Sequence, residues 1–155
     1  MSKELSRHEI RKMALQALFP LEFNQDVDKK DAIMQAIELE HHEMVDAEQE
    51  NFVPAYLDQL VVGVCEHKVA LDELIQKHLK KGWSIKRLSK MDLCILRIAS
   101  YEMMYEKDVP NKVALNEALE LTKTFSDDQS RKFVNGVLSA INTDLTKEVA
   151  DKDKL

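Results

Sequence analysis

Basic and aromatic residues stand side by side at two places in the sequence. Phe133 directly follows Arg131 and Lys132, and Phe19 lies two helical turns beyond Arg11-Lys12. Proteins that bind single-stranded RNA hold phosphates with cationic groups and stack bases on flat side chains. An aromatic residue at helical spacing is more often part of a core. The two clusters are therefore open to two interpretations, RNA binding or packing of the aromatic rings in a core.

The usual catalytic and cofactor motifs are absent from the sequence. It contains no GxxxxGK[ST], GxGxxG, HExxH or GxSxG motif. Cys65 and Cys94 have no partner at metal-binding or disulfide spacing, which favours reduced, inert thiols. Glu38 and His42 share a helix face, but a metal site needs three or four ligands. We therefore expect no catalytic residue, no metal site and no cofactor.

The net charge of −6 is unevenly distributed. From Glu22 to Glu50 there are ten acidic and two basic residues, whereas residues 51–155 carry sixteen of each. Residues 1–20 carry four bases and two acids. A nucleic-acid surface needs a basic patch, so an evenly acidic protein would be a poor candidate. Because the acidity belongs to one segment, most simply a solvated loop, a local RNA surface elsewhere is allowed.

The elements that must position these residues are predicted to be helices. The 155 residues, 45% of them hydrophobic, are enough for one domain with a core. Three glycines and three prolines are too few for a fold built on frequent tight turns, so an all-α domain is expected. The sequence has neither an apolar run long enough to span a bilayer nor a secretory signal. We expect a cytoplasmic protein without membrane association.

Apolar spacing predicts about seven helices. Ser6 and Glu9 have the spacing of a capping box at the start of the first. A short helix and then a mobile loop are expected in the acidic segment, followed by two helices with a bend near Glu66. Gly82 is a helix stop, and three more helices follow it. Residues 143–155 lack an apolar face and are predicted to be a flexible polar tail.

Four strings in the sequence resemble the NusB family of bacterial transcription antitermination factors. They are residues 11–19 (RKMALQALF), 92–102 (DLCILRIASYE), 108–123 (DVPNKVALNEALELTK) and 132–138 (KFVNGVL). The similarity runs from about Ser6 to Ile141. It implies an all-α domain at residues 1–142, made of two small packed helical bundles at about 6–82 and about 83–142.

The resemblance also implies a function without catalysis. Members of the family bind the boxA element of nascent RNA together with the small-subunit ribosomal protein that acts as NusE. They join the complex that keeps RNA polymerase elongating through ribosomal RNA operons. The partners expected for this chain are therefore boxA-type single-stranded RNA, that ribosomal protein and the RNA polymerase antitermination complex.

The resemblance assigns the RNA surface to two helix starts. The expected RNA-binding residues are Arg7, His8, Arg11, Lys12 and Gln16 near the first helix start, and Gln129, Arg131, Lys132 and Phe133 near the last. The apolar spacing places the bases of the first helix on or beside its solvent face. The sequence departs from the family's run of arginines by reading Arg7-His8-Glu9, and Glu9 is expected to serve the helix cap. Missing RNA contacts could then come from the partner.

Other residues of these strings are expected to stabilise the fold rather than touch a ligand. Asn116 and Asn135 would form buried polar contacts between helices. Gly136 would permit close helix packing, because a glycine inside a helix costs about 1 kcal/mol against alanine and needs a reason. Asp92 and Arg97 would act as a cap or as ion-pair partners.

Two alternative functions stay open from the sequence. NusB-like domains also occur attached to RNA cytosine methyltransferases, where they help to engage RNA. This chain has no Gly-rich methyl-donor domain, so an enzyme of that kind would need a separate subunit. The second alternative is a homodimer that masks its own basic surface.

Overall fold

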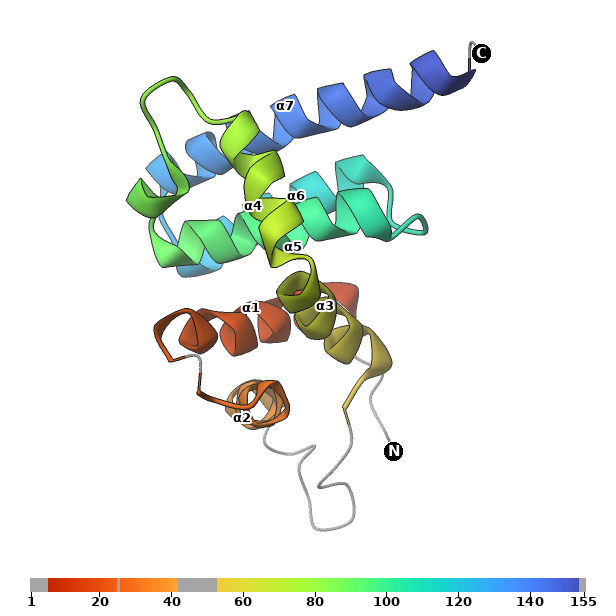
Figure 1. Cartoon of the computed structure of the whole chain (residues 1–155). Coiled ribbons are helices and arrows are strands. Elements are labelled where there is room, and N and C mark those ends of the chain that lie inside the picture. Colours follow the sequence, from red (N-terminus) through yellow and green to blue (C-terminus); the bar gives the residue numbers. More distant parts are fainter. Residues whose placement is uncertain (1–5, 25, 42–52, 154–155) are drawn as a thin grey trace. The chain divides into compact units, whose positions relative to one another are not determined.

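The computed structural model describes residues 6–24, 26–41 and 53–153. Over these residues the chain forms seven α-helices and one short 3-10 helix, with no strand (Figure 1). The chain divides into two compact units, Met1–Glu66 and His67–Leu155. The predicted all-α fold of about seven helices is confirmed.

The first unit contains three helices: α1 (Arg7–Phe23), α2 (Lys29–His41) and α3 (Ala55–Glu66). Helix α1 packs against both α2 and α3, which also contact each other. The predicted capping box starts α1, because the Glu9 N–H donates to Ser6 Oγ (3.1 Å) and the Ser6 N–H donates to Glu9 Oε2 (3.4 Å). These two bonds satisfy backbone donors that no helical carbonyl can reach.

Helix α2 is the short helix predicted within the acidic segment. Its buried face consists of Ala32, Ile33, Ala36 and Ile37, at the spacing of one helix side. The mobile loop predicted after it falls on residues 42–52, which lie outside the described residues. Most of the described residues between Glu22 and Glu50 are therefore helical.

The second unit contains α4 (Lys68–Lys77), the 3-10 helix η2 (Ile85–Arg87), α5 (Lys90–Tyr105), α6 (Asn111–Phe125) and α7 (Asp128–Asp153). Helix α5 is central, since α4, α6 and α7 all pack against it. Every residue from Asp92 to Met103 is buried. The charged side chains in this stretch must find partners inside the unit, because burying an unpaired charge is costly.

Helix α4 belongs to the second unit, although the sequence placed residues up to 82 in the first bundle. Leu71 and Ile75 are fully buried, and α4 packs on α5 and α7. Arg97 of α5 donates to Asp72 of α4 twice, from Nε to Oδ1 at 2.7 Å and from a terminal nitrogen to Oδ2 at 2.9 Å. A two-pronged contact of this kind fixes both distance and orientation. It confirms Arg97 as an ion-pair partner.

Helix α7 continues to Asp153, through most of the segment 143–155 that was predicted to be a flexible tail. No glycine or proline follows Gly136, so nothing in the sequence stops the helix. Polar contacts hold its second half: Asn142 accepts a hydrogen bond from Asn111 at 3.2 Å, and Asp144 pairs with His78. An apolar pattern cannot reveal a helix that is held in this way.

Three structural assignments made from the sequence are wrong. Asn116 and Asn135 are exposed, so they are not buried contacts between helices. Gly136 is also exposed, and a Cβ added there would meet no atom of a neighbouring element within 4 Å. These residues lie on outward faces of α6 and α7. The glycine therefore does not serve close helix packing.

Two glycine substitutions are expected to change stability in opposite directions. Gly136→Ala should raise the free energy of unfolding by up to about 1 kcal/mol, because alanine is the better helix former and the site is open. Gly82→Ala should lower it by about 1–2 kcal/mol, because Gly82 has φ +90°, which disfavours a Cβ. Urea denaturation measures both. A destabilised Gly136→Ala variant would show that this face of α7 is more crowded than the structure shows.

Candidate nucleic-acid interface

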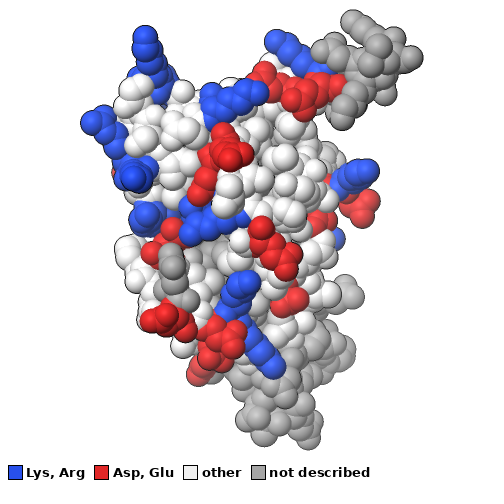
Figure 2. All heavy atoms as spheres, in the orientation of Figure 1, with Lys and Arg blue, Asp and Glu red and all other residues white. Residues whose placement is uncertain are grey.

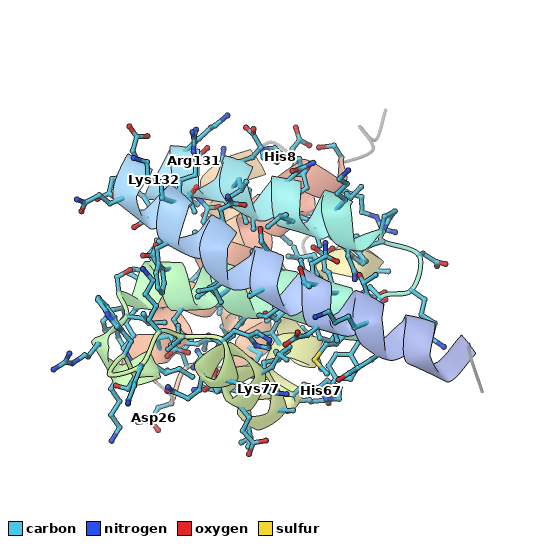
Figure 3. The ribbon with its side chains drawn as sticks, turned by 90° about the horizontal axis from the view of Figure 1, so that it is seen from above. His8, Asp26, His67, Lys77, Arg131 and Lys132 are labelled. Atoms are coloured by element: carbon cyan, nitrogen blue, oxygen red, sulfur yellow. The ribbon has the colours of Figure 1, made fainter. Side chains whose placement is uncertain are left out.

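The start of α7 carries four of the predicted RNA-binding residues. Asp127 caps the helix, with Oδ1 accepting a hydrogen bond from the Ser130 N–H at 2.8 Å. Gln129, Arg131 and Lys132 are exposed, and Phe133 is half-buried. Figure 3 shows Arg131 and Lys132 projecting from the first turns of α7. The cap sets where the helix begins and hence which of these side chains face solvent.

A buried carboxylate holds this helix start in place. Asp92 of α5 is 7% exposed, and its two oxygens accept hydrogen bonds from the hydroxyls of Ser126 (3.2 Å) and Ser130 (2.8 Å). Its backbone N–H donates to Ser89 Oγ at 3.1 Å, which caps α5. Asp92 therefore joins the start of α5 to the turn before α7 and to the first turn of α7. This confirms its structural role.

Trp83, which the sequence did not single out, lies beside Phe133. The ring centroids are 6.2 Å apart and the ring planes are tilted by 34°. The side chain of Gln76 on α4 fixes the backbone here, donating to the Trp83 carbonyl at 2.9 Å and accepting from the Ile85 N–H at 3.0 Å. Gly82, with its positive φ, turns the chain just before the tryptophan. The hydrogen bonds of Gln76 and the turn at Gly82 thus fix the backbone of Trp83.

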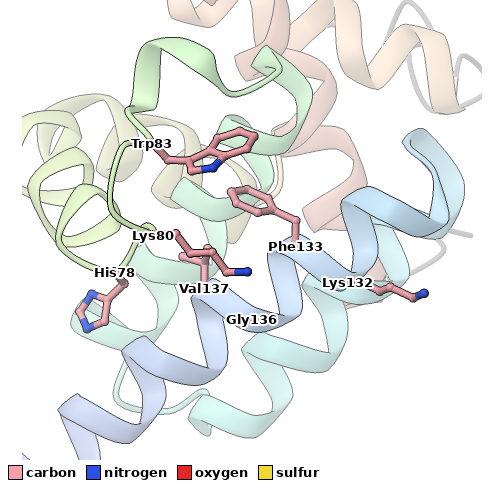
Figure 4. Close-up of a pocket in the computed structure, with 7 residues that line it drawn as sticks. All are labelled: His78, Lys80, Trp83, Lys132, Phe133, Gly136 and Val137. Atoms are coloured by element: carbon pink, nitrogen blue, oxygen red, sulfur yellow. The ribbon is translucent and has the colours of Figure 1, made fainter.

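Trp83 and Phe133 border a surface pocket of about 440 Å³, the aromatic pocket (Figure 4). Its remaining walls are His78, Lys80, Lys132, Gly136 and Val137. In Figure 4 the two rings lie next to each other, Lys80 points toward α7, and Lys132 extends away from the rings. A second hollow shares the two rings and is also lined by Arg87, Asp92 and Asp127. The ring pair therefore borders one hollow with two lysines and one with an arginine and two carboxylates.

The segment between α4 and α5 is strongly basic. From Lys77 to Lys90 there are six basic residues and no acidic one. The six are Lys77, Lys80, Lys81, Lys86, Arg87 and Lys90, and all are exposed. Figure 2 shows basic side chains gathered along the edge where this segment lies in Figure 1. The charge balance of residues 51–155 hides this segment, whereas a local count of charges would have found it.

The other predicted RNA-binding residues lie on α1, in the first unit. Arg7 is exposed, and its guanidinium carbon lies 3.6 Å from the centroid of the Tyr56 ring of α3. A stacked guanidinium keeps its N–H groups at its edge, where phosphate oxygens can reach them. His8, Lys12 and Gln16 are half-buried. The structure thus gathers Gln129 to Phe133 on one unit and these residues on another.

The predicted position of Arg11 on or beside the solvent face of α1 is wrong, because Arg11 is only 3% exposed. It lies four residues before Leu15 and seven before Leu18, both buried, so the three share one helix face. The apolar spacing predicted a solvent-side position for Arg11, but the buried face of α1 also includes Leu15 and extends to Arg11. Of the arginines and lysines in the described helix α1, Arg7 alone is exposed.

His78, in the wall of the aromatic pocket, is held from two directions. Its Nδ1 lies 2.8 Å from the Leu74 carbonyl oxygen, and its Nε2 lies 2.5 Å from Oδ2 of Asp144 on α7. The hydrogen bond from His78 lowers the pKa of the Asp144 carboxyl below its ordinary value of 3.8. The pair ties α4 to the middle of α7.

The described ranges contain neither a metal-binding cluster nor a membrane-spanning helix. Within them, no group of three or more His, Cys, Asp and Glu side chains is arranged to hold a metal ion. Of the Glu38–His42 pair, His42 lies outside those ranges. Cys94 is buried in α5. No helix in the described part of the chain is both long and apolar enough to cross a membrane.

Comparison with known proteins identifies the family. The NusB family model matches residues 8–143, which is most of the chain. The chain belongs to the NusB family. A curated NusB relative is the transcription antitermination protein NusB of Enterococcus faecalis, which is 58% identical over 149 residues. That match covers 96% of this chain and 97% of the relative.

Solved NusB structures have the same fold. The T. maritima NusB structure is 33% identical, has a TM-score of 0.75 and is matched over 91% of this chain and 93% of its own. A structure of the antitermination factors NusB and NusE in complex with dsRNA is 26% identical, with a TM-score of 0.71 over 88% of this chain and 96% of that one. The resemblance seen in the sequence is confirmed. The chain is a NusB-family antitermination factor and not an enzyme.

The Asp92 contact predicts a loss of stability on its removal. Asp92→Ala should lower the free energy of unfolding by about 1–3 kcal/mol, because the Ser126 and Ser130 hydroxyls lose their acceptor. As a control, Glu120→Ala removes the same charge from an exposed pair with Lys123 and should cost less than about 1 kcal/mol. Equal losses in urea denaturation would contradict an anchoring role for Asp92.

The His78–Asp144 pair predicts a pH-dependent effect of Asp144→Asn. The pKa of Asp144 is lowered in the folded state, so its stabilising contribution is complete above 3.8 and disappears as the pH falls through the lower folded value. Near neutral pH the variant should melt at a lower temperature than the parent. The difference should close in strong acid. Asp108→Asn, at an exposed site, is the control, and a melting difference independent of pH would argue against the ion pair.

Proposed function

We propose that this chain is an RNA-binding adaptor that binds boxA-type single-stranded RNA together with the ribosomal protein acting as NusE. The observation that carries the proposal is the basic surface of the second unit, formed by the exposed bases of residues 77–90 and by Arg131 and Lys132. This surface contains the ring pair of Trp83 and Phe133. Cations for phosphates beside exposed flat side chains are typical of single-strand binding.

The aromatic pair favours unpaired over paired RNA. Bases in a duplex are stacked on one another, so a protein ring can stack on a base only where the strand is open or ends. The solved complex of a NusB with NusE contains dsRNA, as its name says. For this chain, the exposed Trp83 is the reason to propose single-stranded RNA, and duplex RNA becomes a comparison in the test.

The ribosomal partner is part of the proposal because the first helix offers few free cations. Arg11 is buried and Lys12 is half-buried, which leaves Arg7 as the exposed base of α1. Affinity for RNA depends on the number of phosphates that are neutralised. A partner protein would add to that number. In this role the chain would join RNA polymerase during transcription of ribosomal RNA operons.

The alternative of a methyltransferase-associated module has less support. The E. faecalis relative, an antitermination protein by name, is matched over 97% of its length. A relative of that size has no room for a separate methyl-donor domain. The similarity therefore favours a factor that acts through binding.

Titration of labelled single-stranded boxA-type RNA tests the proposal. A scrambled strand and a duplex serve as comparisons, each with and without the ribosomal protein and at two salt concentrations. We expect preference for the boxA-type strand, tighter binding with the partner present, and affinity that falls steeply with salt. Equal affinity for the scrambled strand, even with the partner present, would overturn the proposal.

Charge-neutral variants in the same assay test the surface. Arg131→Gln and Lys132→Gln should weaken binding of all strands alike, and each should reduce the slope of log affinity against log salt by about 0.7. Lys147→Gln is a matched control, since Lys147 is exposed on the same helix about 22 Å further along. Equal effects of all three would show attraction by overall charge instead of a defined surface.

A further inference from the structure

We propose that the aromatic pocket is a nucleobase subsite, in which one unpaired RNA base stacks on Trp83 beside Phe133 and over Gly136. Lys80 and Lys132 would take the phosphates next to that base. The inference rests on the proposed RNA binding and specifies how the bound strand is held. Trp83, Lys80 and Gly136 thereby become members of the binding site.

The tryptophan has the exposure and support that a stacking residue needs. Trp83 is 47% exposed, although tryptophan is largely buried on average. The tilted, 6.2 Å arrangement with Phe133 leaves the rings in loose rather than face-to-face contact. Gln76 holds the backbone on both sides of the ring, at Trp83 and Ile85. An exposed ring on a fixed backbone loses little freedom when a base stacks on it.

Gly136 supports the same subsite. It lies inside α7, where a glycine weakens the helix relative to alanine. Nothing within the described structure requires its lack of a side chain, since a Cβ would meet no neighbouring element within 4 Å. The residue lines the aromatic pocket, so a Cβ there would occupy space available to a ligand. Glycine allows a ligand to approach the backbone closely.

The charges around the rings select the side on which the RNA backbone runs. Lys80 and Lys132 line the aromatic pocket, which has no carboxylate, whereas the neighbouring hollow contains Arg87 together with the carboxylates of Asp92 and Asp127. The lining of the first hollow is therefore net positive and that of the second net negative, so phosphates favour the first. Lys80 also belongs to the basic segment from Lys77 to Lys90, which has no acidic residue. A flat apolar surface with cations at its border matches a nucleotide.

The single tryptophan of the chain makes the subsite directly observable. A base that stacks on Trp83 should quench its fluorescence, while the anisotropy of labelled RNA reports binding separately. The ligands are a short single-stranded boxA-type RNA and, as a phosphate-only probe, inorganic polyphosphate. We expect RNA to quench the fluorescence and polyphosphate to bind with little quenching. RNA binding without quenching would overturn the subsite alone, whereas absence of RNA binding would overturn the proposed function.

Variants separate base stacking from phosphate binding. Trp83→Leu should weaken RNA binding about tenfold or more, the size of a lost base stack, and should leave the salt slope and the affinity for polyphosphate unchanged. Trp83→Phe should retain most of the affinity because it retains a ring. Tyr105→Leu, at an exposed aromatic outside the pocket, is the control and should bind RNA like the parent.

The Gly136→Ala variant tests the pocket without the risk that RNA affinity is lost through unfolding. This variant is expected to be at least as stable as the parent, as argued above, so a several-fold loss of RNA affinity would come from the filled pocket. Parent-like RNA affinity in both Trp83→Leu and Gly136→Ala would overturn the proposal. Equal loss of RNA and polyphosphate binding in Trp83→Leu would overturn it as well, because the residue would then act on the fold of the surface.

Discussion

The buried carboxylate of Asp92 joins the two helices on which the candidate interface depends. It stands at the start of α5 and is only 7% exposed, so water alone solvates its charge poorly. The hydroxyls of Ser126 and Ser130 supply the necessary hydrogen bonds, and both belong to the chain that leads into α7. The hydrogen-bonding requirement of one side chain thus holds the start of α7, which Asp127 caps, against α5. The exposed bases and Phe133 at that helix start follow from it.

The opposite side of the interface depends on α4, which is also joined to α5 by a buried charge. The buried guanidinium of Arg97 is paired with the half-buried carboxylate of Asp72, and removing Asp72 would take away the two hydrogen bonds that join the helices. Helix α4 then carries Gln76, whose amide holds the backbone of Trp83. Two buried ions on one helix therefore position the two aromatic rings. Apolar packing alone, being non-directional, would specify their placement less sharply.

The sequence predicts what depends on periodicity and local bonding. The seven helices follow from apolar spacing, and the spacing of Ser6 and Glu9 predicts the cap of α1. Periodicity cannot show long-range polar contacts. For this reason the boundary between the bundles was predicted after residue 82, although the Arg97–Asp72 contact joins α4 to the second unit. The helical stretch of α7 that Asp144 helps to hold was missed for the same reason. The solvent-side position that apolar spacing predicted for Arg11 was wrong, because the residue shares a helix face with buried leucines. Trp83 was missed because it stands outside the regular apolar patterns.

The affinity for RNA depends on the charge of the local surface and not on the net charge of the chain. Electrostatic attraction is screened beyond about 8–10 Å at physiological salt, so a phosphate near residues 77–90 responds to six bases and not to a total of −6. Such cations give affinity without sequence preference, because phosphates are the same in every sequence. Stacking on Trp83 and Phe133 adds affinity for unpaired strands but tolerates any base. Preference for one RNA sequence then requires hydrogen bonds to base edges. In the proposed complex Gln129, which is exposed and lines a hollow with Phe133, would make such a bond, and the ribosomal partner would provide others.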